Sequence, residues 1–513
     1  SGSTHNNTTF IGNAAGLKNT SNDNVAIGAE AYLSGSSATQ IVAIGRNAGK
    51  GITTGQGVIA IGPNAAQESE ASTHNVAIGW QAMYGASGDS NRNIGIGTST
   101  LLDITTGDSN VGVGYQAAQN VTSGGYNIAI GNNALATATT STGSVAIGHN
   151  AGKETTVNET IHIGKESGYS SIGSGSVFVG HQSGYFPHGD KNVYVGWKAG
   201  KGDSSTTSNS QNVGVGSEAL TSISDGDENV AVGDQAGYSI TTGDYNVGLG
   251  SDALRSVTTG HGNIGIGRLA GSILANHSYT VAIGYGAGQD AVTQSSVLIG
   301  QSAGYNNNGG DYNVFIGKSA GVNVTTGGSN VIIGPNAGPS STSTASNELY
   351  INNSQSNTPL IKGDFSAPSL TVNGDLGVTG SLSVTGSTLA VQREMKNDIT
   401  TSTTLSDSYS VYQALADGGG VGTVTLTAPS SPSTGDTYLI VAGAFGNPGG
   451  GGAPTLTGLV RIIANTGQTI NGVNTNITLM QSTALQPEYK TAHLVCVDTN
   501  TWVMTLSAQA PVA

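Results

Sequence analysis

One short motif recurs along most of the chain: an apolar residue, any residue, an apolar residue and glycine, then a small residue three positions later. Its twenty closing glycines are Gly12, Gly28, Gly45, Gly62, Gly79, Gly97, Gly114, Gly131, Gly148, Gly164, Gly180, Gly196, Gly216, Gly233, Gly250, Gly267, Gly284, Gly300, Gly317 and Gly334. Successive glycines are 16 to 18 residues apart, except for a spacing of 20 between Gly196 and Gly216. A fixed short period predicts a stacked solenoid, in which each repeat contacts only its neighbours.

The residues before each closing glycine predict a short β-strand. After the first copy, Val, Ile or Leu stands three and one residues before the glycine, as at Val76 and Ile78, usually with a small residue such as Ala77 between them. Alternation of this kind is typical of a strand with two unlike faces. We expect the Val and Ile side chains to line the inside and the small residue to point outward. A second short strand should complete each repeat, giving an all-β, parallel β-roll of about 20 rungs with a 17-residue period.

Two further positions in the repeat indicate how it turns and stacks. Ala stands three residues after the glycine in seventeen of the twenty copies, which predicts a tight corner. Asn stands four residues before it in twelve copies. Asn side chains can cap a turn and, when stacked, bond from one repeat to the next. The sequence therefore predicts an asparagine ladder along the roll.

Composition restricts the classes of function. Only 9% of the residues are charged and 80 are glycine, which suits turn-rich β structure and not a helical enzyme. The net charge of −14 disfavours binding to nucleic acid or to anionic membranes. The single cysteine, Cys496, excludes an intrachain disulfide, and we expect no cofactor and no membrane insertion. The chain begins at Ser1 without Met, so we expect more sequence to precede it.

The chain divides into four segments. Residues 1–343 form the β-roll array, and residues 344–391 form a neck with a six-residue pattern that begins Leu370-x-Val372-x-Gly374. Residues 392–419 read as a linker that could hold a short helix around 408–416, and residues 420–513 as a small C-terminal β domain. A lone six-residue stave cannot bury its Leu and Val, so the neck predicts a triple-stranded β-prism. Because a thin roll also buries little surface for its size, we expect an intertwined homotrimer.

The repeat core Asn75-Val76-Ala77-Ile78-Gly79, with Ala82 after it, resembles the head repeats of trimeric autotransporter adhesins. Together with the Thr-Thr-Gly turns and the stretch from Asn347 to Phe365, it is even more similar to arrays in bacteriophage tail fibres and related virion appendages. The resemblance implies a trimeric β-roll and a structural role. It implies nothing specific about a ligand.

Candidate binding residues are of two kinds. Aspartates recur six residues before the closing glycine, and their turn oxygens could hold calcium; the candidates are Asp108, Asp227, Asp244 and Asp311. Aromatic residues follow the glycine directly and could form platforms for glycans; these are Trp80, Tyr115, Trp197 and Tyr285. The simpler alternatives are that the aspartates are good turn formers and that the aromatic rings pack over turns or between protomers. We find no paired carboxylates or activated nucleophile, so no catalytic residue is assigned and an enzyme is not expected.

We therefore predict a structural fibre protein of a virion, a phage tail or capsid fibre located on an extracellular appendage. It would act as a rigid trimeric spacer and contribute to attachment to the host surface. Its partners would be further copies of itself, other virion proteins, and a host surface glycan or protein. The alternative is a bacterial cell-surface trimeric adhesin or extracellular filament. A third hypothesis is a glycan-degrading tailspike.

Overall fold

A computed structural model describes residues 7–203 and 208–377 and Thr379, and the backbone of the strands between Lys396 and Ala508. The chain splits into two compact units, Ser1–Gly377 and Val378–Ala513. We call the first the roll unit and describe each unit by itself. All the regular elements in the described residues are strands.

The roll unit contains one three-residue strand for each of the twenty motifs. These are β1 (Thr9–Ile11), β2 (Val25–Ile27), β3 (Val42–Ile44), β4 (Ile59–Ile61), β5 (Val76–Ile78), β6 (Ile94–Ile96), β7 (Val111–Val113), β8 (Ile128–Ile130), β9 (Val145–Ile147), β10 (Ile161–Ile163), β11 (Val177–Val179), β12 (Val193–Val195), β13 (Val213–Val215), β14 (Val230–Val232), β15 (Val247–Leu249), β16 (Ile264–Ile266), β17 (Val281–Ile283), β18 (Val297–Ile299), β19 (Val314–Ile316) and β20 (Val331–Ile333).

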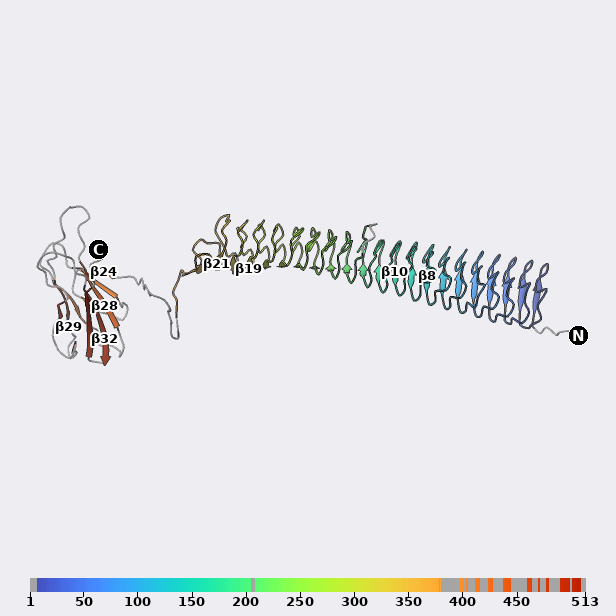
Figure 1. Cartoon of the computed structure of the whole chain (residues 1–513), viewed down its shortest axis with the longest axis horizontal. Coiled ribbons are helices and arrows are strands. Elements are labelled where there is room, and N and C mark those ends of the chain that lie inside the picture. Colours follow the sequence, from blue (N-terminus) through green and yellow to red (C-terminus); the bar gives the residue numbers. More distant parts are fainter. Residues whose placement is uncertain are drawn as a thin grey trace. The chain divides into compact units, whose positions relative to one another are not determined.

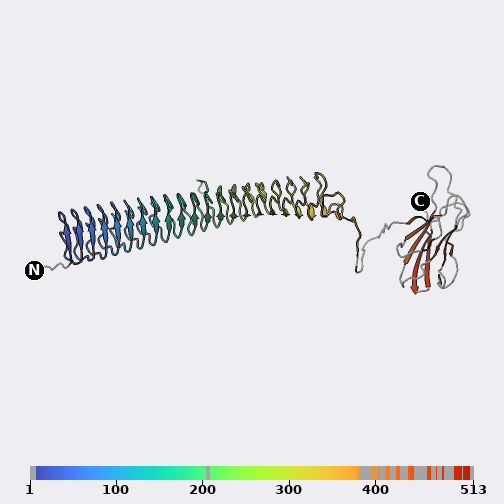
Figure 2. The same ribbon diagram turned by 180° about the vertical axis from the view of Figure 1, so that it is seen from behind.

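Each strand pairs in parallel with the next, in strict register. Val76, Ala77 and Ile78 of β5 lie beside Ile94, Gly95 and Ile96 of β6, and the same pairing holds at every step from β1 to β20. Figure 1 shows the result as a row of similar rungs, and Figure 2 shows the same row from behind. The predicted parallel β-solenoid of about 20 rungs with a period near 17 residues is confirmed.

The last strands change the direction of pairing. Strand β21 (Glu348–Ile351) still pairs in parallel with β20, but β22 (Ile361–Asp364) and β23 (Ser369–Val372) follow as an antiparallel meander. Strand β23 holds the first Leu-x-Val of the six-residue pattern. The later staves lie mostly outside the described residues, so the three-chain prism stays a prediction.

The expected second strand in each repeat is absent from the described rungs. After the closing glycine the chain returns through consecutive turns in which alternate residues have left-handed backbone, such as Gln81 (φ 55°) and Met83 (φ 51°). This return leg still hydrogen bonds from rung to rung, since the Met83 amide donates to the Thr100 carbonyl at 2.9 Å. Alternation of right- and left-handed residues keeps the leg extended without making it a strand.

The expected orientation of the strands was wrong. In β2 to β20 the middle residue is buried and the Val, Ile or Leu on each side is partly exposed, as in β5, where Ala77 is fully buried. The reason is the thinness of the roll. Between the strand and the facing part of the return leg there is room for one bulky side chain, so the two branched residues of each strand must face outward.

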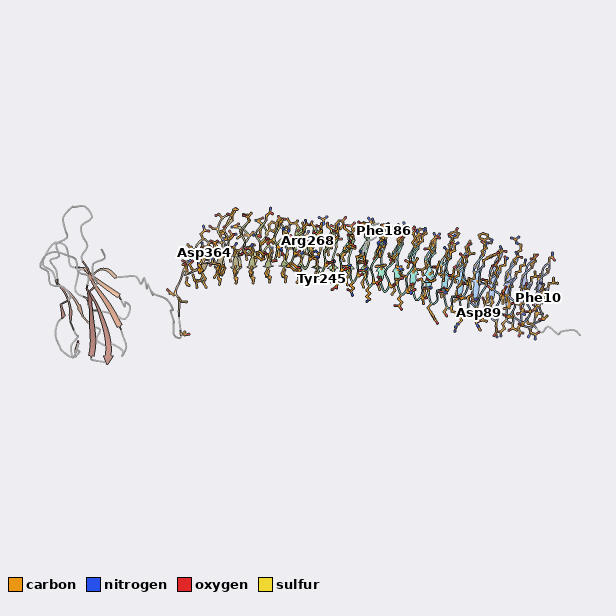
Figure 3. All side chains as sticks on the ribbon, viewed as in Figure 1. Phe10, Asp89, Phe186, Tyr245, Arg268 and Asp364 are labelled. Carbon is orange, nitrogen blue, oxygen red and sulfur yellow. The ribbon has the colours of Figure 1, made fainter. Side chains whose placement is uncertain are left out.

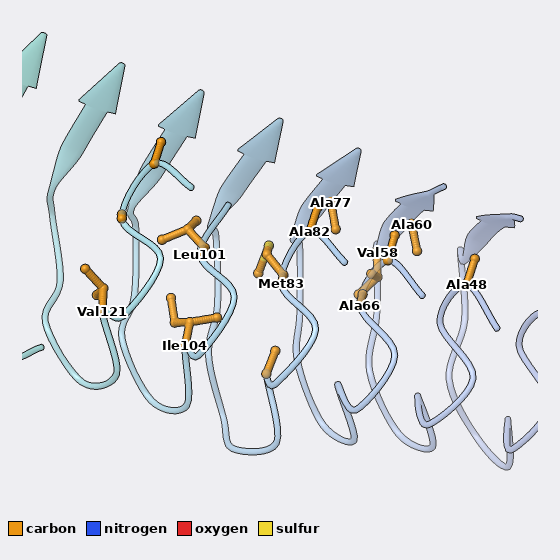
Figure 4. Close-up of a cluster of buried hydrophobic side chains, with 14 of the residues drawn as sticks. Ala48, Val58, Ala60, Ala66, Ala77, Ala82, Met83, Leu101, Ile104 and Val121 are labelled. Carbon is orange, nitrogen blue, oxygen red and sulfur yellow. The ribbon is translucent and has the colours of Figure 1, made fainter. Parts of the chain in front are cut away.

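Two facing positions in the core vary in size in opposite directions: the middle residue of the strand and the fourth residue after the closing glycine. Where the middle residue of the strand is large, as at Phe178 and Tyr194, the fourth residue after the closing glycine is itself glycine, Gly184 and Gly200. The relation is reversed elsewhere: Met83 packs against Gly95, the small middle residue of the next rung, where an added Cβ would lie 3.0 Å from Met83 Cγ. Figure 4 shows Met83 within this cluster of buried side chains. A protein interior packs to nearly constant density, so a large side chain stands at one of these two facing positions but not at both.

Three consecutive rungs carry aromatic middle residues. His162, Phe178 and Tyr194 are fully buried, and their ring centroids follow one another at 5.5 Å. His162 Nε2 lies 2.9 Å from Thr160 Oγ1, but Nδ1 has no hydrogen-bond partner. Burial lowers the pKa of His162 to about 3, so this ring is neutral in the folded chain at ordinary pH.

The asparagine ladder predicted from the sequence is present. Asn229 Oδ1 accepts the backbone N–H of Asn246 at 3.0 Å and its Nδ2–H at 3.0 Å, while Asn229 Nδ2 donates to the Gly243 carbonyl at 2.8 Å. The same bonds recur from Asn93 to Asn127 and from Asn212 to Asn263. Each buried amide therefore has partners in the next rung, as buried polar groups require.

The closing glycines are required by the backbone. They have φ near 130°, a region closed to other residues, and they stack directly on one another. A Cβ added to Gly79 would lie 2.5 Å from the carbonyl oxygen of Gly97 in the next rung. This column explains why the motif ends in glycine in every copy.

The second unit has ten strands among its described residues, in two sheets. They are β24 (Lys396–Ile399), β25 (Thr403–Thr404), β26 (Val411–Leu415), β27 (Thr423–Thr427), β28 (Thr437–Gly443), β29 (Leu459–Ile463), β30 (Thr469–Ile470), β31 (Ile477–Thr478), β32 (Lys490–Asp498) and β33 (Thr501–Ala508). Within residues 408–416, where a short helix was considered, the described residues Val411–Leu415 form β26, which pairs along its length with β28, so the helix is wrong for these residues.

Candidate functional surface

The outward side of the stacked strands is the main candidate surface of the roll unit. We call it the strand face: the first and third residues of β2 to β20, all Val, Ile or Leu. Single residues of the strand face are up to 39% exposed, as at Ile96 and Val232, although neighbours in the stack cover both of their flanks. The result is a double column of branched aliphatic side chains running the length of the array.

Two further columns border the strand face. The leading column is the fifth residue before each closing glycine, and the trailing column is the residue directly after the glycine. The most exposed tyrosines of the roll lie in the leading column: Tyr126 (67%), Tyr245 (58%), Tyr279 (64%) and Tyr312 (61%). Figure 3 labels Tyr245 at the edge of the roll unit.

The backbone of the leading column makes its large side chains costly. Every residue of this column from Asp23 to Ser329 has a positive φ, between 52° and 69°. Glycine takes this conformation most easily and occurs there at Gly57 and Gly143, whereas a bulky residue in it is uncommon. The side chains of the exposed tyrosines in this column have no hydrogen-bond or ring partner in the described chain, although each tyrosine amide donates to a carbonyl of the preceding rung. Side-chain bonds within the chain therefore do not explain them.

The predicted glycan platform residues all lie in the trailing column. Trp80, Tyr115, Trp197 and Tyr285 are 46–50% exposed. Lys198 Nζ lies 4.1 Å from the ring centroid of Trp197, and the guanidinium of Arg268 lies 5.9 Å from that of Tyr285. The structure does not bring the four rings together: Trp80 and Tyr115 are two rungs apart, about 9.6 Å, and the others are separated by five rungs each. A continuous platform is not formed, and glycan binding stays a prediction.

The predicted calcium residues take part in a second polar ladder. Asp108 Oδ1 accepts the backbone N–H of Asn91 at 2.6 Å, one rung earlier. Asp227, Asp244 and Asp311 do the same for the preceding rung, at 2.6 to 2.8 Å. The other oxygen of Asp244 faces His261 Nδ1 at 3.3 Å.

These bonds give the aspartates a structural role. In residues 7–203 and 208–377, no three His, Cys, Asp or Glu side chains are grouped as metal ligands would be. Asp227 and Asp244 are in adjacent rungs, but Asp108 and Asp311 are far from both along the array. Calcium binding at these positions remains a prediction.

A group of charged side chains surrounds the trailing column between β9 and β12. His149, Lys165 and His181 follow the closing glycines of three successive rungs. A hydrogen bond from Gln182 Nε2 at 2.9 Å, together with the charges of Lys165, His181 and His149, lowers the pKa of Glu166. Glu166 Oε1 lies 3.7 Å from Lys165 Nζ, so this short stretch of the column is held by charge.

Comparison of the chain with family models, with curated proteins and with solved structures found no match. No helix in the described parts of the chain is long and apolar enough to cross a membrane.

The sequence analysis assigned the side chains of the strand face to the interior and so missed this exposed aliphatic surface of the roll unit. A signal for the correct orientation was present in the repeats. Wherever the middle strand residue is large, the fourth residue after the glycine is glycine, as in Phe315 and Gly321. Wherever that fourth residue is Leu, the middle residue is small, as in Gly214 and Leu220. Reciprocal size at two positions means that they face each other across the core.

Proposed function

We propose that this chain is the subunit of an elongated, non-enzymatic homotrimeric fibre that projects from a virion, serves as a rigid spacer and contributes to host attachment. The observation that carries the proposal is the strand face: a continuous aliphatic surface that the folded chain leaves in contact with water. Rigidity is supported by the parallel ladder, the asparagine ladder and the glycine column, which connect every rung to the next.

The size of the strand face argues for a permanent partner. Nineteen steps of about 4.8 Å make the array about 90 Å long, and two columns of branched side chains are about 10 Å wide, giving about 900 Å². A typical stable interface buries about 800 Å² on each partner, and the largest apolar patch of a typical monomer is about 300–600 Å². A second copy of the same chain matches this surface in length, period and character along its whole extent.

Three copies fit the cross-section of the roll. The leading and trailing columns are six residues apart, so the strand layer with its margins is at most about 20 Å wide. Three such faces, arranged as a triangular prism, would lie about 6 Å from a common axis, which leaves room for one layer of Val and Ile from each copy. Leu370 and Leu376, at the end of the roll unit, are each 67% exposed. Their exposure also favours an assembly in which the apolar residues of the six-residue pattern pack against those of other copies.

The assembly is tested on the full chain by sedimentation equilibrium. The expected mass is that of three chains. Val232→Lys should weaken the assembly while leaving the β circular dichroism unchanged, because Val232 points outward and three lysines would meet near the axis. Thr242→Lys adds the same charge in an exposed turn and is the matched control. A wild-type chain that remains a folded monomer at micromolar concentration would refute the trimer.

The location and role of the fibre need a separate experiment. Antibody raised against residues 420–513 should label appendages of virus particles in electron micrographs of the source material. Label on bacterial cell envelopes would instead support the alternative, a cell-surface adhesin or filament. Release of new reducing ends from capsular or lipopolysaccharide glycans would support the third hypothesis, a glycan-degrading tailspike.

A further inference from the structure

Three tyrosines of the leading column form a regular row, which we call the tyrosine row. Tyr245 stands before β15, Tyr279 before β17 and Tyr312 before β19, so the row uses every second rung. The rungs between them carry only Gly262 and Ser295 in the same column. Because rungs are about 4.8 Å apart, successive tyrosines of the row are about 9.6 Å apart along the array.

The rings of the tyrosine row are open to water and separated from one another. More than half of each side chain is exposed. The ring of Tyr279 lies against the neighbouring small residue, since a Cβ added to Gly262 would be 2.9 Å from Tyr279 Cδ1 and 3.1 Å from Cε1. The small residues of the intervening rungs therefore leave room for the rings, and each ring remains available to a ligand.

The backbone makes these large side chains unfavourable, which indicates a use outside the fold. Tyr245, Tyr279 and Tyr312 have φ of 59°, 61° and 60°, a region in which bulky residues are uncommon. Ser295 and Ser329 hold the same position with φ of 52° and 57°, so a small residue is sufficient for the rung to form. Residues kept in an unfavourable backbone conformation without side-chain bonds in their own chain point to an interaction elsewhere.

A row of polar side chains runs beside the tyrosine row. It is formed by the residue before each leading residue, and in these five rungs it consists of Asp244, His261, Ser278, Gln294 and Asp311. Asp311 Oδ1 accepts the backbone N–H of Gln294 at 2.8 Å, and His261 Nδ1 accepts that of Asp244 at 3.0 Å. The other carboxylate oxygen of Asp311 and Nε2 of His261 have no hydrogen bond within the described residues. Groups that can bond to hydroxyls therefore border the tyrosines.

An evenly spaced aromatic row with polar groups beside it fits an extended polysaccharide. A sugar ring packs its face of C–H groups on an aromatic ring, and its hydroxyl groups bond to the polar side chains at the edge. In an extended β-1,4-linked glycan each sugar is turned over relative to the one before it. Every second sugar therefore presents the same face, and one disaccharide unit has close to the length of two rungs. The carboxylates of Asp244 and Asp311 disfavour an acidic glycan at this position.

We infer that the tyrosine row binds a neutral, extended β-1,4-linked polysaccharide that runs along the array, with one tyrosine under every second sugar. The inference rests on the proposed role in host attachment and adds the chemical class of the ligand. Tyr245, Tyr279 and Tyr312 then lie under the first, third and fifth sugars. Affinity should therefore increase with the length of the glycan up to five sugars and change little beyond that.

Calorimetric titration of the full chain tests the inference, with β-1,4-linked oligomers of glucose and of N-acetylglucosamine, two to six sugars long, as probes. One of the two series should bind with the expected dependence on length, and Tyr279→Ser should weaken binding of its hexasaccharide about tenfold. Tyr126→Ser is the matched control, because Tyr126 has the same backbone and similar exposure but has Arg92 and Glu159 two rungs away in place of tyrosines. The control should bind as the wild type does, and α-1,4-linked maltohexaose should not bind.

Several results would overturn the inference. These are no binding of either series, equal losses in Tyr126→Ser and Tyr279→Ser, or equal binding of maltohexaose. Release of single chains by Tyr279→Ser in sedimentation, without glycan binding by the wild type, would show that the row packs between copies instead. The proposed fibre would stand in each case, because it depends on the mass of the wild-type assembly and on the labelling of virus particles. Conversely, glycan binding by a chain that is absent from virions would refute the proposed location and leave the tyrosine row as a binding site.

Discussion

In each rung the middle strand residue and the fourth residue after the closing glycine share one space in the core, and this sharing predicts how the stability changes when either residue is replaced. Phe178 is fully buried, and Gly184 leaves room for its ring: a Cβ at Gly184 would lie 2.5 Å from Phe178 Cδ1. Phe178→Ala should lower the free energy of unfolding by about 3–5 kcal/mol, the usual cost of removing a buried aromatic ring. Gly184→Leu alone should also be destabilising, because the new side chain has no space.

The two destabilising changes should compensate each other when combined. Leu220 occupies the equivalent position over Gly214, where a Cβ would lie 3.5 Å from Leu220 Cδ1, and its φ of 52° is close to the 53° of Gly184. Burying a Leu contributes about 2–3 kcal/mol, and its left-handed backbone costs about 1–2 kcal/mol. Phe178→Ala with Gly184→Leu should therefore be about 1 kcal/mol more stable than Phe178→Ala, and remain less stable than the wild type.

Denaturant unfolding followed by circular dichroism and by tryptophan fluorescence measures these differences. Trp197 follows the closing glycine of the next rung after that of Phe178. All variants must be compared at one protein concentration, because association adds to the apparent stability. If the double variant is no more stable than Phe178→Ala, the two positions do not share one space and the account of the core is incorrect.

Three further outcomes are expected. Gly79→Ala should destabilise the roll by several kcal/mol in denaturant unfolding, because Gly79 has φ 134° and its new Cβ would meet the backbone of Gly97. Gly377→Ala, with open space around it, is the control and should be neutral. Equal effects of the two substitutions would contradict this explanation. Lowering the pH from 7 to 4.5 should reduce the free energy of unfolding of the wild type by roughly 3 kcal/mol more than that of His162→Phe. The reason is that between the ordinary pKa near 6.5 and the folded pKa of about 3 only the unfolded chain protonates this ring. Stability curves of the two proteins that run parallel over this pH range would exclude the effect. Asn229→Ala should cost about 2–3 kcal/mol in the same assay by leaving buried partners in the next rung unpaired, and a change below about 0.5 kcal/mol would show that the ladder is not needed for stability.

The corrected orientation of the strands strengthens the expectation of an assembly that the sequence had raised for another reason. With Val and Ile inside, a single chain would have had a modest core and an outer surface of small residues. With Ala77 inside and Val76 and Ile78 outside, the chain has a smaller core and an extensive aliphatic face. The case for further copies now depends on a surface that can be altered without disturbing the fold.

The same correction changes the meaning of the aromatic candidates. Trp197 and Tyr285 border the strand face, so in a parallel trimer they would lie where neighbouring copies meet. The packing alternative for these rings, between protomers, agrees with that geometry. Recognition of a host surface would then depend on other parts of the chain, such as the segment from Lys201 to Gln211 that lengthens one repeat, or residues 420–513.

The sequence by itself determined the number of rungs, their period, their parallel register and the polar ladder, because each of these follows from what recurs every 17 residues or so. A column of Asn or Gly is visible in the sequence before it is seen in space. The sequence did not determine which face of each strand is inside. Alternation states only that two faces differ, and the usual assumption that the more apolar face is buried fails when the body is only two layers thin.

The tertiary structure decided the orientation through volume. One strand and one return leg enclose a space that Phe178 fills when Gly184 lies opposite, or that Leu220 fills when Gly214 does, and no space remains for two branched residues from every strand. The Val and Ile columns therefore lie on the outside because the interior has no room for them. Their exposure to water is unfavourable, and a second copy of the chain packed on the strand face would remove it.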